Sequence, residues 1–307
     1  MKTRLGCVCM AMCLQVALGS LAFAQIIFTN VSVADAFVRS LAPTSNYGGA
    51  GALSVSGTIA TNAVGQQEGL LDSFMRFDVS GPVSNLNHAF GVGQWVIVRV
   101  TLNLFEQGAP NNATFNRGVG LFEVRWIADN SWAEGTGNPN APTTDGIVWN
   151  DEPSVLNPNL DVSLGTFVNG GTDGLVRLML TVPPGFVDNV STGALVSFYV
   201  TAATNSPVGF TFHSHNFVDP TQWPFLEVTA VPIPQITSLA IIGSNAKIIF
   251  STATNLTYAV EYSNDLVGGS WDTLANVTGN GGPMSAIDFG VAAMAKRFYR
   301  VHLLVSP

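Results

Sequence analysis

Hydrophobic and polar residues alternate along much of the chain, as they do in strands that bury one face. One such series places Met75, Phe77 and Val79 against Arg76 and Asp78. The same alternation recurs in segments 96–104, 122–126, 176–182 and 196–200, with even-numbered residues on the apolar side. Turn-rich spacers such as 135–140 separate these segments, and no long segment has a helical period. We therefore predict an all-β fold, an antiparallel, jelly-roll-like β-sandwich.

Two prolines mark the expected domain boundary. The stretch Val231-Pro232-Ile233-Pro234 interrupts the strand pattern, because proline cannot donate to a sheet ladder and favours an extended linker. We therefore predict a first domain over 25–230, a linker over 231–234 and a small sandwich over 235–307.

The first 24 residues have the organisation of a secretory signal. Lys2 and Arg4 supply the positive end, residues 5–21 are mostly apolar, and Ala22-Phe23-Ala24 is a small-x-small cleavage site. We expect cleavage after Ala24 and a protein that is secreted or held at the cell surface. All three cysteines would leave with the signal, which excludes disulfide, thiol and cysteine-zinc chemistry. No later stretch has the roughly 18 apolar residues of a membrane span.

Charge narrows the range of partners. The chain has 12 Lys+Arg and 20 Asp+Glu, and loss of the two basic residues of the signal brings the net charge to −10. Such a charge repels a nucleic-acid backbone, so we expect no nucleic-acid partner.

An ordered series of short motifs in the first domain resembles the DNRLRE family of secreted β-sandwich modules, which overlaps a family of carbohydrate-binding modules. The motifs are Asp35-Ala36-Phe37-Val38, Asn46-Tyr47-Gly48-Gly49, Met75-Arg76-Phe77-Asp78, Val100-Thr101-Leu102-Asn103-Leu104, Trp132-Ala133-Glu134, Val148-Trp149-Asn150 with Pro153, and Phe225-Leu226-Glu227-Val228. Near the end the family carries Phe-x-Ser-basic-Glu, where this chain has Phe212-His213-Ser214-His215-Asn216. The name-giving hexapeptide is absent. The resemblance implies a secreted sandwich of the carbohydrate-binding type.

The C-terminal segment is similar to small fibronectin-like modules at the ends of exported bacterial proteins. The likeness lies in Tyr258-Ala259-Val260-Glu261-Tyr262-Ser263, Gly269-Ser270-Trp271 and Arg297-Phe298-Tyr299-Arg300-Val301. We expect Tyr258, Trp271 and Phe298 to anchor its small core.

No catalytic constellation stands out. Asp151 and Glu152 are adjacent carboxylates, which we interpret as solvated turn residues, since neighbours on a strand point to opposite faces. His213 and His215 share a strand face and could bind one metal ion, but no third ligand is evident, so a partly exposed pair is preferred. The chain has no Gly-x-Ser-x-Gly nucleophile elbow. We therefore predict that the protein is not an enzyme.

Four arginines occupy equivalent outward positions on the predicted strands: Arg76, Arg99, Arg125 and Arg177. Guanidinium groups bind carboxylates bidentately, so a face that carries them would suit an acidic polysaccharide. Tyr199, on the same parity, and Trp223, among turn residues, are the expected stacking platforms. The alternative is a set of cross-strand ion pairs, because Asp78, Glu123 and Glu227 have the same outward parity.

A bridging divalent cation would offset the repulsion between this acidic protein and an acidic glycan. We consider structural calcium, with Asp35 and Asp78 as the first ligands to test. The function predicted from the sequence is non-catalytic polysaccharide binding or attachment. The alternative is a structural or adhesive surface protein that self-associates through its β-sandwiches.

Overall fold

The computed structural model describes residues 25–57, 60–61, 65–67, 69–107, 118–267 and 269–304. The predicted signal, residues 1–24, lies outside the described residues. Two compact units are found, Gln25–Ile233 and Pro234–His302.

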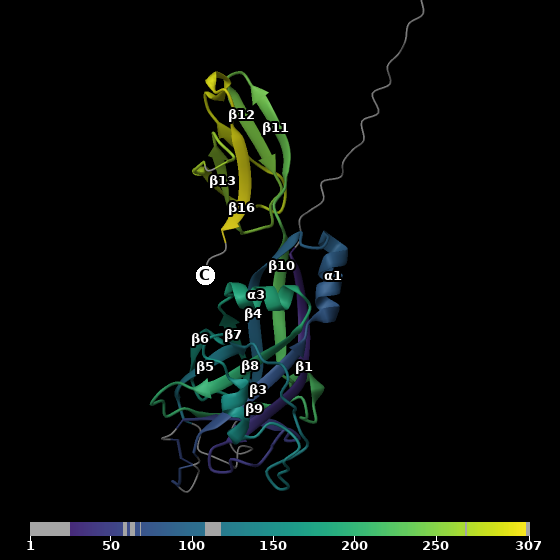
Figure 1. Ribbon diagram of the computed structural model, residues 1–307, viewed down its shortest axis with the longest axis vertical. Helices are drawn as coiled ribbons and strands as arrows, with labels where there is room; N and C mark the ends of the chain where they lie inside the picture. Colours follow the sequence, from purple (N-terminus) through teal and green to yellow (C-terminus); the bar gives the residue numbers. More distant parts are fainter. Residues whose placement is uncertain are drawn as a thin grey trace, which may run out of the picture. The chain divides into compact units, whose positions relative to one another are not determined.

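The first unit is built of antiparallel strands, several of which are labelled in Figure 1. They are β1 (Ile26–Arg39), β2 (Ala52–Ser56), β3 (Leu71–Asp78), β4 (Trp95–Glu106), β5 (Gly120–Ile127), β6 (Val162–Asn169), β7 (Gly174–Leu180), β8 (Leu195–Ala202), β9 (Gly209–His213) and β10 (Phe225–Pro232). The pairing order is β1-β10-β4-β9-β2-β3-β8-β5-β6, with β7 on the side of β4. Pairing of β1 with β3 closes six of these strands into a barrel. The all-β antiparallel fold is confirmed, and the barrel closure is a feature that strand periodicity does not predict.

The main core follows the predicted alternation. Met75 and Phe77 of β3 and Val124 of β5 have no exposed surface, and Trp126 is 9% exposed. Phe198 of β8 contacts Phe77 edge to face, with ring centroids 5.6 Å apart. Each aromatic side chain removes a large apolar area from water, and this burial stabilises the closed sheet.

Strand β4 departs from the predicted alternation near its start. The sequence pattern places Val96 and Val98 in the core, but the buried side chains are Trp95 and Ile97. The register against β10 shifts at this point, which marks a β-bulge. An extra residue in one strand reverses which face each side chain takes, and from Val100 onward the predicted parity holds.

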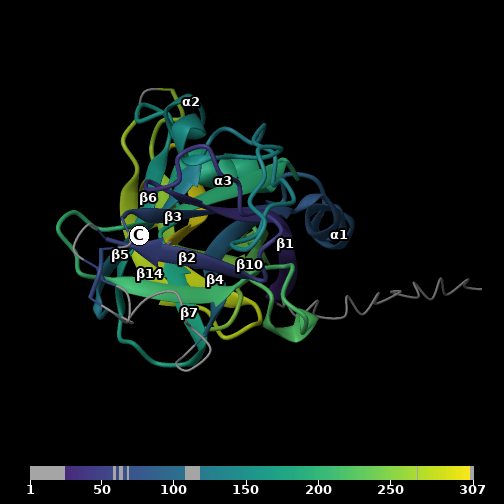
Figure 2. The ribbon, with the colours of Figure 1, turned by 90° about the horizontal axis from the view of Figure 1, so that it is seen from below.

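Short helices accompany the strands. They are α1 (Ser80–Phe90), α2 (Glu152–Val155) and α3 (Pro184–Ser191), with 3-10 turns η1 (Trp149–Asp151) and η2 (Pro220–Gln222). Helix α1 lies beside β1 (Figures 1 and 2) and buries only Val83 and Leu86. Two apolar residues are too few to give a detectable helical period, so the sequence pattern does not predict this helix.

A second apolar cluster covers the outer face of β1, β3, β5 and β8. The strands contribute Ala34, Ala36, Val38, Phe74, Ile127 and Tyr199, and the covering segment between β5 and β6 contributes Trp132, Ile147 and Val155. Outward positions on these strands are therefore shielded from solvent. Alternation distinguishes the two faces of a strand, but it does not show that loops cover the second face.

The expected linker is partly strand. Val231 has no exposed surface and pairs with β4, and β10 continues to Pro232. The prediction that all of 231–234 is linker is therefore wrong for its first two residues. Pro232 is the last residue of β10, so its missing N–H falls where the ladder ends and does not interrupt it.

The second unit consists of two three-stranded sheets, ordered β11-β12-β15 and β14-β13-β16. Its elements are β11 (Ile236–Ile242), β12 (Asn245–Phe250), β13 (Thr257–Ser263), β14 (Asp272–Thr278), β15 (Met284–Asp288), η3 (Val291–Ala293) and β16 (Phe298–Leu304). The expected anchor Tyr258 is 1% exposed, whereas Trp271 and Phe298 are only half-buried.

Candidate functional site

The four predicted arginines are divided between two groups of strands. Arg76 and Arg125 lie on β3 and β5, which flank β8, while Arg99 and Arg177 lie on β4 and β7. The single arginine face considered from the sequence is therefore not formed.

Arg76 is bound to the protein itself. Its Nη1 donates to the backbone carbonyls of Asn130 and Trp132, both at 2.8 Å, and the guanidinium lies 4.6 Å from the centroid of the Trp132 ring. Arg125 pairs with Glu123 at 3.3 Å and donates to the carbonyl of Asp161 at 3.2 Å. These two arginines hold the segment that covers the outer face of the sheet. The alternative of internal pairing fits them better than a ligand-binding face.

Tyr199 is not an exposed platform, and the prediction that it is one is wrong. It is 7% exposed, and its hydroxyl donates to Asp72 Oδ2 at 2.7 Å. The sequence pattern placed Tyr199 on the correct, outer face of β8, but the segment between β5 and β6 covers that face. Trp223 is half-buried, and its Nε1 donates to the carbonyl of Phe217 at 2.8 Å.

Two acidic side chains meet beside Tyr199. Asp72 and Glu152 are 2% and 8% exposed, so the interpretation of Glu152 as a solvated turn residue is wrong. Burial raises the pKa of both carboxyl groups, and the charge of Asp72 raises that of Glu152 further. Because two buried carboxylates in contact repel each other too strongly for both to ionise, the pair holds a proton at neutral pH. A pocket of about 350 Å³ opens onto this pair.

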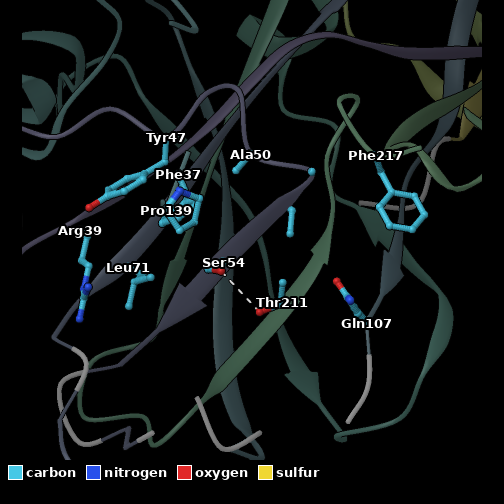
Figure 3. A pocket seen from close by; sticks show the side chains of 12 residues that line it. Phe37, Arg39, Tyr47, Ala50, Ser54, Leu71, Gln107, Pro139, Thr211 and Phe217 are labelled. Carbon is cyan, nitrogen blue, oxygen red and sulfur yellow. Dashed lines mark hydrogen bonds between the residues drawn. The ribbon is translucent and has the colours of Figure 1, made fainter. Parts of the chain in front are cut away.

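A more apolar pocket of about 340 Å³ lies over β2 and β9. Figure 3 shows Ser54 of β2 and Thr211 of β9 at its centre, with their hydroxyl oxygens 3.4 Å apart. Phe37 and Tyr47 form one side, stacked with ring centroids 4.6 Å apart and planes within 4°. Phe217 stands on the opposite side. We refer to this feature as the aromatic pocket.

Arg39 and Gln107 add polar groups to the aromatic pocket. Arg39 comes from the end of β1, and Gln107 follows β4. The pocket thus combines flat aromatic surfaces, hydroxyls, an amide and one guanidinium. That combination binds molecules with both apolar faces and polar edges.

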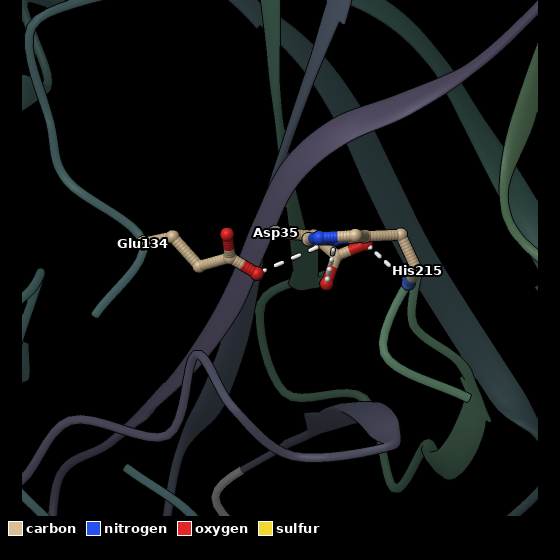
Figure 4. Close-up of side chains that lie close together, drawn as sticks. All are labelled: Asp35, Glu134 and His215. Atoms are coloured by element: carbon tan, nitrogen blue, oxygen red, sulfur yellow. Dashed lines mark hydrogen bonds and ion pairs between the residues drawn. The ribbon is translucent and has the colours of Figure 1, made fainter. Parts of the chain in front are cut away.

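A cluster of titratable side chains adjoins the same loops (Figure 4). His215 Nδ1 lies 3.3 Å from Asp35 Oδ1 and 3.3 Å from Glu134 Oε1. Asp35, in β1, has no exposed surface, while His215 and Glu134 come from loops and are half-buried. The neighbouring Asp35 carboxylate raises the pKa of His215, and burial raises the pKa of Glu134. We call this group the Asp-Glu-His cluster.

The loop after β9 connects the two features. Ser214 Oγ donates to the carbonyl of Ala50 at 2.5 Å, which fixes the loop against the aromatic pocket. His215 then enters the Asp-Glu-His cluster, and Phe217 enters the pocket. Asn216 Nδ2 donates to the carbonyl of Gly48 and to Glu134 Oε1, both at 2.9 Å. Segments that carry the family resemblance therefore meet at this end of the first unit.

The two residues suggested for calcium lie in different surroundings. Asp35 belongs to the Asp-Glu-His cluster, whereas the exposed Asp78 accepts from the backbone N–H of Ser80 at 2.9 Å at the start of α1. The expected partly exposed histidine pair is not found, because His213 is 6% exposed and is packed between Phe105 and Phe217.

The sequence offered partial signals for these features. The sequence analysis named Asp35, Glu134 and His215, each in a motif or as a candidate ligand. Nothing in the sequence indicated that these residues, from three distant segments, lie close together in the fold. The pocket residues Phe37 and Tyr47 belonged to the quoted motifs without an assigned role.

Comparisons with known proteins do not identify a family or a function for this chain. No family model and no curated protein matches the chain. Among solved structures, the chain is similar to one described as a "putative secreted protein" from Parabacteroides distasonis, at 7% sequence identity over 92% of this chain and 93% of that chain, with a TM-score of 0.23. A likeness at this level carries no functional argument, and the resemblance to the DNRLRE family stays a prediction.

Proposed function

We propose that this is an exported, non-catalytic polysaccharide-binding protein and that the aromatic pocket is its binding site. The observation that carries the proposal is the pocket's composition: the half-buried ring of Phe217 offers the aromatic surface, Ser54 and Thr211 form a polar floor, and the stacked Phe37–Tyr47 pair, each residue 7% exposed, forms the opposite wall. Sugar rings present C–H faces that stack on aromatic rings and hydroxyl edges that bond to such polar groups.

Arg39 points to an acidic glycan. It is the one basic side chain among the residues that line the pocket. A guanidinium binds a carboxylate through two parallel hydrogen bonds, so a uronate ring would have its charge met at this position. The long-range repulsion from the protein's negative charge is screened within about 8 to 10 Å at physiological salt, which leaves the local contact dominant.

Export is part of the same proposal and rests on the N-terminal pattern of residues 1–24. Among the residues that the structure describes, no helix is long and apolar enough to cross a membrane.

Affinity electrophoresis tests the binding proposal. Residues 25–307 would be run through gels that contain alginate, pectin, xylan, laminarin or no polysaccharide, each with calcium and with chelator. We expect retardation in a uronate gel, loss of retardation in Arg39→Gln, and unchanged retardation in the control Arg177→Gln, whose side chain is exposed on β7. Equal migration of the unaltered protein in every gel, or an equal loss in both variants, contradicts the proposal.

Exposed apolar residues in the second unit favour a second candidate, self-association. Leu239 and Ile241 of β11 are 54% and 63% exposed, although each pairs with a fully buried residue of β12. An exposed apolar edge strand pairs readily with another chain. Light scattering should then show oligomers that increase with concentration and that disappear in the double variant Leu239→Asn, Ile241→Asn. A strict monomer at high concentration rules this candidate out.

A further inference from the structure

We propose that Asp35, Glu134 and His215 bind one divalent transition-metal ion in tetrahedral geometry, and that zinc is the ion they suit best. The three residues reach one point from β1, from the loop after β5 and from the loop after β9 (Figure 4). The inference is independent of glycan binding.

The spacing of the donor atoms fits a shared ion. Ligand atoms bound to one tetrahedral zinc at about 2.0 to 2.1 Å lie about 3.3 to 3.4 Å from each other. The distances from His215 Nδ1 to Asp35 Oδ1 and to Glu134 Oε1 are both 3.3 Å. All three donor atoms lie within 4.8 Å of one another, so a small approach of the two carboxylates completes the set. A cation between them removes the repulsion that opposes this approach.

Two of these atoms are shielded from solvent without a satisfied hydrogen bond. Asp35 Oδ1 and His215 Nδ1 are both buried, and neither has a well-aligned partner among the described residues. Asp35 as a whole has no exposed surface. A buried, unpartnered carboxylate oxygen is costly, and a metal–ligand bond would satisfy both this oxygen and the ring nitrogen.

The surrounding hydrogen bonds orient the donors towards the same point. Ser32 Oγ and the backbone N–H of His215 donate to Asp35 Oδ2 at 3.0 and 2.8 Å, which leaves Oδ1 directed at the cluster. Asn216 Nδ2 donates to Glu134 Oε1 at 2.9 Å. Outer bonds of this kind are the usual support of metal ligands.

The donor set also separates zinc from calcium. Calcium takes six to eight oxygen ligands, whereas a neutral imidazole nitrogen is a characteristic ligand of zinc and neighbouring transition metals. The side chains of Glu134 and His215 keep 22% and 20% of their surface exposed, so water has access as a fourth ligand. The competing explanation is a protonated His215 held by two carboxylates, with no metal involved.

Metal titration distinguishes these explanations. Residues 25–307, stripped of metal by a chelator, would be titrated with zinc, manganese and calcium chlorides in a calorimeter. We expect one zinc per chain, bound at least about 10-fold more tightly than calcium. Cobalt(II) should give the intense visible absorption of a tetrahedral complex.

Variants locate the ion. His215→Gln and Glu134→Gln should weaken zinc binding by more than about 100-fold, because loss of outer-shell partners alone costs 10- to 100-fold. His88→Gln, an exposed histidine of α1, is the matched control and should bind zinc as the unaltered protein does. Thermal melting without metal checks that each variant is folded, and zinc should raise the melting temperature of the unaltered protein but not of folded His215→Gln.

Three results would overturn the proposal: no saturable zinc binding by the unaltered protein, zinc binding retained in folded His215→Gln, or calcium bound more tightly than zinc. The first result would assign the cluster to ion pairing by a protonated His215, the second would place the bound zinc elsewhere on the protein, and the third would make the bound ion calcium.

Discussion

The buried acid pair gives a quantitative prediction about pH and stability. Asp72 and Glu152 are almost fully buried, and Asp72 Oδ1 and Glu152 Oε1 have no well-aligned hydrogen-bond partner among the described residues. The folded protein therefore keeps a proton on the pair. In the unfolded chain, both groups ionise near their ordinary pKa values of about 4. Between that pH and the raised folded pKa values, the folded state binds about one more proton than the unfolded state.

The sign and size of the effect follow from this difference. Extra protons on the folded state mean that stability falls as pH rises, by about 1.4 kcal/mol per pH unit for one proton. From pH 5 to pH 7 the loss amounts to about 2 to 3 kcal/mol. Glu152→Gln replaces the shared proton with an amide N–H of similar shape, so the part of this component that belongs to Glu152 should disappear, while burial keeps the pKa of Asp72 raised. Relative to the unaltered protein, the variant should gain stability steadily as pH rises through this window.

Urea unfolding at pH 5, 6, 7 and 8, followed by tryptophan fluorescence, measures this difference. Subtracting one protein from the other cancels the titration of all shared groups. Asp188→Asn, which alters an exposed carboxyl in α3, is the control and should show a constant difference across the range. A constant difference for Glu152→Gln as well would refute the shared proton.

Two further substitutions test how the covering segment is held. Arg76→Met removes two charge-assisted hydrogen bonds to loop carbonyls, so it should lower the free energy of unfolding by about 3 kcal/mol. The control Arg177→Met, at an exposed position, should change the free energy of unfolding by less than about 0.5 kcal/mol. Equal effects of the two variants in urea unfolding would contradict the role of Arg76 in holding the covering segment. Gly48→Ala places a Cβ against the backbone carbonyl of Glu134, which cannot move aside, so we expect a loss of about 1 to 3 kcal/mol. At Gly170 an added Cβ would meet no atom within 4 Å, so Gly170→Ala should have little effect on the melting temperature. A similar loss of stability in both variants would show that the close approach of Gly48 to the Glu134 carbonyl is unimportant.

Local alternation was enough to predict five strands of the first unit, β3, β4, β5, β7 and β8, and the main-core side chains that they supply. Phe77, Val124 and Phe198 were placed inward from their spacing alone, and all three have no exposed surface. The information is local, because successive side chains of a strand point to opposite faces whatever the strand pairs with. The same rule failed at Val96 and Val98, where a bulge inserts an extra residue.

Long-range contacts decided the rest. Tyr199 was assigned to the correct face, yet a segment that contributes Trp132, Ile147 and Val155, 44 to 67 residues earlier in the chain, covers that face and buries it. Asp35 and His215 are separated by 180 residues and meet only because β1 and the loop after β9 lie at one end of the barrel. The sequence by itself therefore determined the strands with clear alternation and, away from the bulge in β4, which side of those strands is apolar. The choice of strand partners, which no local pattern specifies, determined what is exposed, what is paired and where the candidate sites lie.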